Sequence, residues 1–130
     1  MALLDTNVLL AAVIQPEHLP EAAQTLLQDR ANRVYFSAVS LWEIAIKRSL
    51  NRSGFDFRSE DIEQLARETG FTELPLHCAH CHGVGHMPWH HRDPFDRLLV
   101  AQAQFLPARF LTSDGQLARY SELVWAFPLR

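Results

Sequence analysis

Short apolar runs alternate with segments of helical periodicity along the chain. The apolar runs have the length of buried strands and lie at residues 2–4, 34–36, 71–74, 109–112 and 123–125. Apolar residues with helical spacing, together with cap and stop signals, predict helices over about 8–15, 20–32, 40–50, 59–69 and 93–103, and a short one after 114. Strands that alternate with helices are typical of βαβ units. We therefore predict one α/β domain over residues 1–130, built on a parallel sheet.

Two stretches carry specific expectations. The run Asn51-Arg52-Ser53-Gly54 is predicted to stop the helix that begins at Ser40. The secondary structure of residues 77–87 is left unassigned, because Gly83 and Gly85 weaken any helix there.

Several acidic residues lie at or near the junctions between predicted strands and the helices that follow them. Asp5 closes the first strand and Asp114 closes the strand at 109–112. Glu43 lies in the first turn of its helix, and Asp96 lies at the opening of another. Because open parallel sheets bind ligands beyond the carboxyl ends of their strands, these positions are the first candidates for a functional site.

Helix capping is the simpler explanation of each acid taken singly. Ser40 and Glu43 have the spacing of a capping box, which predicts Ser40 as the N-cap. Asp93 before Pro94 fits an N-cap followed by proline at the first helical position, with Asp96 two residues later. The two aspartates that close strands could likewise cap the helices that follow them.

Capping does not require that several elements carry carboxylates at the same edge. If these ends converge, three or four carboxylates share one pocket, and their repulsion raises pKa values and destabilises the fold. Helix N-termini relieve part of that repulsion, and a divalent cation relieves most of it. A ligand set made of oxygen atoms selects Mg²⁺ or Mn²⁺ over Zn²⁺. The pattern therefore favours a metal site suited to phosphate chemistry.

Four blocks of sequence carry a family resemblance. They are Leu3-Leu4-Asp5-Thr6-Asn7, Ser40-Leu41-Trp42-Glu43-Ile44, the stretch DPFDRLLVAQA at 93–103, and Leu111-Thr112-Ser113-Asp114. In this order and spacing they resemble the PIN-domain family, and within it the VapC-type ribonuclease toxins of bacterial toxin–antitoxin pairs. The resemblance covers the whole chain and implies a three-layer fold, with a short parallel sheet of about five strands and helices on both faces.

The same resemblance implies an activity and a site. The activity is that of a Mg²⁺/Mn²⁺-dependent endoribonuclease, with RNA as substrate, a cognate antitoxin as partner and a homodimer as assembly. The implied catalytic and metal-binding residues are Asp5, Glu43, Asp96 and Asp114. Polar neighbours of that site are Thr6, Asn7 and Ser113, while Asp93 is read first as a cap and then as a supporting acid.

Six of the seven histidines lie between residues 77 and 91, beside both cysteines. The arrangement of His77, Cys78, Cys81 and His82 suggests a zinc knuckle, but a single C-x₂-C lacks the second ligand pair of a zinc finger. We therefore do not expect a structural zinc ion. The acidic motif is preceded directly by His90, His91 and Arg92. These residues could contact an RNA backbone or could belong to a solvated loop, and the sequence leaves both interpretations open.

Composition and charge exclude several classes of protein function. Apolar residues make up 48% and charged residues 21%, as in globular proteins, and the net charge of −3 argues against a purely electrostatic DNA-wrapping protein. The absence of a signal sequence and of a spanning apolar run leads us to expect a cytoplasmic protein without membrane contact. A haloacid-dehalogenase-type nucleophile at Asp5 is disfavoured, because Asn7 stands where the second aspartate belongs. A PIN-like module that binds protein or RNA without cutting remains the alternative.

Overall fold

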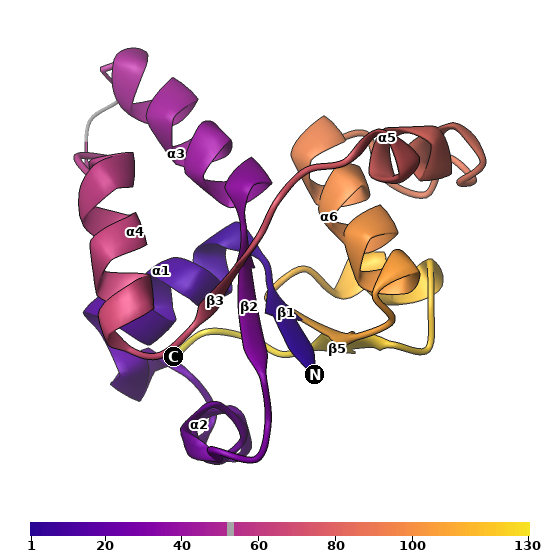
Figure 1. The fold of residues 1–130 in the computed structure, drawn as a ribbon. Helices are drawn as coiled ribbons and strands as arrows, with labels where there is room; N and C mark the ends of the chain where they lie inside the picture. Colours follow the sequence, from indigo (N-terminus) through magenta and orange to yellow (C-terminus); the bar gives the residue numbers. More distant parts are fainter. Residues whose placement is uncertain (52–53) are drawn as a thin grey trace.

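The computed structural model describes residues 1–51 and 54–130 (Figure 1). It confirms an α/β fold in which strands and helices alternate. In chain order, the elements are β1 (Ala2–Leu4), α1 (Thr6–Ile14), the 3₁₀ turn η1 (Pro16–His18), α2 (Glu21–Gln28), β2 (Val34–Ser37), α3 (Ala38–Ser49), α4 (Ser59–Glu68), β3 (Thr72–Leu74), α5 (Cys78–Gly85), α6 (Pro94–Phe105), β4 (Arg109–Thr112), the 3₁₀ turn η2 (Gly115–Arg119) and β5 (Val124–Ala126).

The five strands form one parallel sheet in the order β3-β2-β1-β4-β5. From β1 the chain builds outward through β2 and β3, and it then returns to the other side of β1 with β4 and β5. The direction of building therefore reverses between β1 and β4. In open parallel sheets such a reversal leaves a crevice at the carboxyl ends of the two strands, and ligands bind there. Asp5 and Asp114 follow these two strands directly.

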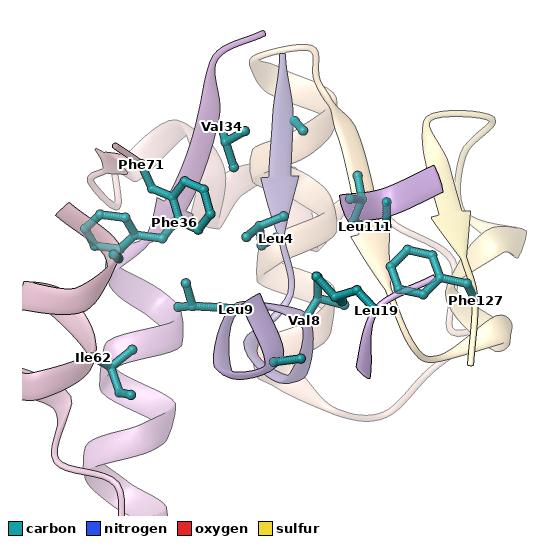
Figure 2. Packing of buried hydrophobic residues seen from close by; sticks show 14 of the residues in the cluster. Leu4, Val8, Leu9, Leu19, Val34, Phe36, Ile62, Phe71, Leu111 and Phe127 are labelled. Atoms are coloured by element: carbon teal, nitrogen blue, oxygen red, sulfur yellow. The ribbon is translucent and has the colours of Figure 1, made fainter. Parts of the chain in front are cut away.

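Two hydrophobic clusters cover the two faces of the sheet. On one face, Leu4 and Leu111 pack with α1, α2 and α4, as Figure 2 shows for Val8, Leu9 and Ile62. On the other face, the neighbouring residues Leu3 and Phe110 pack with α6 and η2. Adjacent strand residues point to opposite faces, so each buried strand contributes to both clusters. This arrangement confirms the predicted three layers (Figure 1).

The predicted start of α3 was wrong. Helix α3 begins at Ala38, and Ser37 is its N-cap, with a side chain that accepts a hydrogen bond from the Val39 N–H at 3.0 Å. Ser40 lies buried inside the first turn and contacts the Thr6 hydroxyl at 3.0 Å. Glu43 is therefore one turn deeper in the helix than a capping box requires.

Two other helix ends also differ from prediction. Helix α4 begins at Ser59, but its N-cap is Arg58, which makes no capping bond through its side chain. Helix α2 ends at Gln28 rather than near Asn32, because the Asp29 carboxylate accepts a hydrogen bond from the Ala31 N–H and turns the chain.

The two stretches with specific expectations have different outcomes. Residues 77–87 are largely helical, because α5 covers Cys78–Gly85 and packs closely on α6, where a Cβ added at Gly83 would lie 3.5 Å from the Cβ of Ala101. The helix stop predicted at 51–54 lies in part outside the described residues. Asn51 has a φ of 52°, the left-handed conformation that commonly ends helices.

Across 1–51 and 54–130, no helix has both the length and the apolar character needed to cross a bilayer.

Candidate active site

Asp5 lies at the end of β1 and connects this strand to α1 and to β4. One carboxylate oxygen accepts the Val8 N–H at 2.8 Å and so caps α1, which confirms the predicted cap. The other oxygen accepts the Thr112 hydroxyl and, at 3.3 Å, the Ser113 N–H. Burial raises the pKa of Asp5 from 3.8 to about 6; these hydrogen bonds oppose the rise, and the charge of Glu43 adds to it.

Glu43 reaches the same edge from α3 and is 4% exposed. The Thr6 hydroxyl, at the start of α1, donates to Glu43 Oε1 at 2.6 Å. Lys47 Nζ lies 2.6 Å from Glu43 Oε2, one helical turn later. Thr6 and Lys47 therefore hold both oxygens of this buried carboxylate. Lys47 was not among the predicted site residues, although the i, i+4 spacing of a glutamate and a lysine could have revealed it.

Asp93 and Asp96 open α6 in the way that the sequence predicts. Asp93 is the N-cap, and its carboxylate accepts the N–H groups of Phe95 at 2.9 Å and Asp96 at 3.3 Å. The pKa of Asp96 is raised from 3.8 to about 7, first by burial and then by the negative charges of Asp93, Asp5 and Glu43, while His91 opposes the rise. The carboxylates of Asp5, Glu43 and Asp93 therefore all disfavour the ionised form of Asp96.

Asp114 completes the edge from the end of β4. One oxygen accepts the Gln116 N–H at 2.9 Å and caps η2, as predicted. Its other oxygen, Oδ2, lies 2.7 Å from Nε2 of His91. The same Nε2 is 3.8 Å from Oδ2 of Asp96. An imidazole from the segment between α5 and α6 therefore stands between two of the predicted metal ligands.

The four predicted ligands share the edge, but they do not form one tight group. Across residues 1–51 and 54–130, the group of three or more metal-binding side chains with ligand atoms within 4.8 Å of one another is His91, Asp96 and Asp114. The carboxylates of Asp5 and Glu43 lie outside this group and are hydrogen-bonded to other partners, which include Thr112 for Asp5 and Thr6 for Glu43. Neither Cys78 nor Cys81 belongs to the group, and both are exposed on α5.

The remaining predicted site residues differ in how exposed they are to solvent. Ser113 contacts Asp5 through its backbone, whereas Asn7 and Arg92 are exposed. His90 is half-buried against Tyr120, with ring centroids 5.1 Å apart. Thr112 and Tyr120 were not among the predicted site residues, and no local sequence pattern marks either of them.

A divalent cation fits the chemistry of these donors. Four carboxylates supply oxygen atoms, the ligands that Mg²⁺ and Mn²⁺ prefer. Two of them, Asp5 and Asp96, have pKa values raised by burial and by neighbouring negative charge. A cation bound there would favour the ionised forms that this environment otherwise penalises.

Comparisons with known proteins agree with this architecture. A family model of the PIN domain matches residues 2–123. A chain in the structure of VapBC2 from Rickettsia felis, bound to a DNA fragment from their promoter, aligns with a TM-score of 0.68 and 14% identity, over 97% of this chain and 98% of that chain. A search of the curated proteins gave no match. Since the family model spans nearly the whole sequence, the chain belongs to the PIN-domain family.

Proposed function

We propose that the protein is a Mg²⁺/Mn²⁺-dependent endoribonuclease that acts as the toxin of a VapC-type toxin–antitoxin pair. The observation that carries the proposal is the gathering of Asp5, Glu43, Asp96 and Asp114 at the point where the sheet reverses direction. We assign these four carboxylates as the metal ligands and catalytic residues. Membership of the PIN-domain family supports a nuclease.

The residues around the four carboxylates have distinct tasks in this mechanism. A bound divalent cation would stabilise negative charge on the scissile phosphate and activate a water molecule. Thr112 fixes Asp5, while Thr6 and Lys47 fix Glu43, so both carboxylates are oriented before a ligand arrives.

Partner, assembly and location are part of the proposal. The solved structure of VapBC2 with promoter DNA supports a cognate antitoxin, because this fold occurs there in a toxin–antitoxin complex. We further propose a homodimer that acts in the cytoplasm on RNA.

The test of this function is cleavage of RNA by the purified protein. Labelled tRNA and a pool of single-stranded RNA oligonucleotides are incubated with Mg²⁺, Mn²⁺ or EDTA, beside DNA of the same sequences. Cleavage of RNA with either metal, and none with EDTA, is expected. Asp5→Asn should abolish it, whereas Asp61→Asn, a matched change on the exposed face of α4, should not. Failure to cut any RNA would favour the non-catalytic binding module.

A further inference from the structure

The segment between α5 and α6 is fastened to α6 by one buried arginine. Arg97 is 5% exposed, and its guanidinium stacks on the Trp89 ring at 3.8 Å. It also donates hydrogen bonds to the carbonyl oxygens of Val84 at 3.4 Å and Met87 at 3.3 Å. Met87 and Trp89 lie in the segment and Val84 lies in the last turn of α5, so Arg97 restricts how both can lie over α6.

The far end of the segment is fastened to η2. The Tyr120 hydroxyl oxygen accepts the backbone N–H of His90 at 3.1 Å and that of His91 at 2.9 Å. Tyr120 is the C-cap of η2, and Asp114 is its N-cap. The same short element therefore positions both Asp114 and the hydroxyl that holds the backbone of His91.

The ring of His91 is held through both of its nitrogen atoms. The Asp93 N–H donates to Nδ1 at 3.0 Å, so Nδ1 must present its lone pair. In the neutral imidazole the proton is then on Nε2, where it can donate to Asp114 Oδ2 at 2.7 Å. Coordination of a metal through Nε2 would move the proton to Nδ1, directly against the Asp93 N–H. The hydrogen bonds around the ring therefore favour a donor over a ligand.

We propose that His91 is a positioning residue that orients Asp114 and does not itself bind the metal. This inference rests on the proposed metal site. His91 occupies one lone pair of Asp114 Oδ2, and the Gln116 N–H occupies one of Oδ1. The carboxylate is thereby fixed with further lone pairs free for a cation. Partners of this kind typically change metal affinity by about 10- to 100-fold when they are removed.

Two substitutions separate a donor from a ligand. His91→Gln keeps an N–H donor at about the position of Nε2, whereas His91→Leu removes it, and both remove the imidazole. Mn²⁺ affinity of the full-length protein is measured by electron paramagnetic resonance, with His82→Leu on the exposed face of α5 as control. We expect His91→Leu to weaken Mn²⁺ binding about 10- to 100-fold, and His91→Gln to stay closer to the parent.

A spectroscopic measurement on the parent protein covers the case in which a variant fails to fold. Two-bond ¹H–¹⁵N correlation spectra of the imidazole report which ring nitrogen carries the proton. The Nε2–H form is expected without metal and should persist when Mg²⁺ is added. An Nδ1–H form with Mg²⁺, equal weakening of Mn²⁺ binding in both His91 variants, or no Mn²⁺ binding by the parent would overturn the inference. Neither readout involves RNA, so a protein that binds Mn²⁺ as expected but cuts no RNA contradicts only the proposed nuclease activity.

Discussion

Replacing Asp96 by asparagine is expected to stabilise the metal-free protein, increasingly so as the pH rises. The folded chain holds the Asp96 carboxyl in a buried, negatively charged neighbourhood that raises its pKa from 3.8 to about 7. Ionisation therefore costs more in the folded than in the unfolded state. Asparagine has nearly the same shape but carries no charge, so the variant avoids that cost.

The sign and size follow from the difference in pKa between the two states. Well below pH 3.8 the carboxyl is protonated in both states, and the folded protein bears no penalty. As the pH rises toward 7, the unfolded chain ionises first, and stability is lost until the folded carboxyl ionises too. Each unit of pKa is worth about 1.4 kcal/mol, so the penalty grows from about 1 kcal/mol at pH 4.5 to about 4 kcal/mol at pH 8. Asp96→Asn should recover most of it.

The assay is urea unfolding in EDTA at both pH values, followed by circular dichroism. The matched control is Asp61→Asn, because Asp61 lies in the first turn of α4 as Asp96 lies in the first turn of α6, but is exposed. The control should gain no stability at either pH. If Asp96→Asn does not raise the free energy of unfolding, or raises it equally at pH 4.5 and pH 8, the assignment of Asp96 to a crowded acidic site is refuted.

Three further predictions concern metal and capping. Excess Mg²⁺ should raise the melting temperature of the parent protein, because Mg²⁺ at 100 times its Kd adds about 2.7 kcal/mol to the free energy of unfolding. This gain should vanish in Asp5→Asn, and equal shifts in the two proteins would place the metal elsewhere. At pH 4.5, Asp93→Ala should lower the free energy of unfolding by about 1 kcal/mol through loss of the α6 cap, while Asp93→Asn keeps it, as urea unfolding can check. A zinc-selective chelator should leave the melting temperature unchanged, since Cys78 and Cys81 are exposed; a collapse would reveal a structural zinc ion.

The parts of the site that sequence could predict are those fixed by local rules. Asp5 and Asp114 follow apolar runs that were predicted to be strands of one parallel sheet, and parallel strands end at the same edge. That the two strands are direct neighbours is a finding of the structure. Asp93 and Asp96 flank Pro94 with the spacing of an N-cap and its helix, and the structure keeps that spacing. Each of these signals lies within a few residues of the side chain concerned.

The parts that escaped prediction depend on distant contacts. Ser37 and Ser40 are equally suitable caps by composition, and Ser40 is drawn inside α3, where it meets Thr6 from another helix. The orientation of His91 depends on Tyr120, about 30 positions away in the chain. No periodicity or motif encodes such a contact, so the sequence left His91 as either a loop residue or an RNA contact.

The most direct test of the central claim is to follow Mn²⁺ binding and RNA cleavage together as Mn²⁺ is added to the metal-free protein. Binding is read by electron paramagnetic resonance, and cleavage is measured on a labelled single-stranded RNA. If the carboxylates at the reversal of the sheet hold the catalytic metal, the cleavage rate should rise in proportion to occupancy, and Glu43→Gln should lower both. Cleavage that persists without bound metal, or that is unchanged in Glu43→Gln while Mn²⁺ binding is lost, would contradict the account.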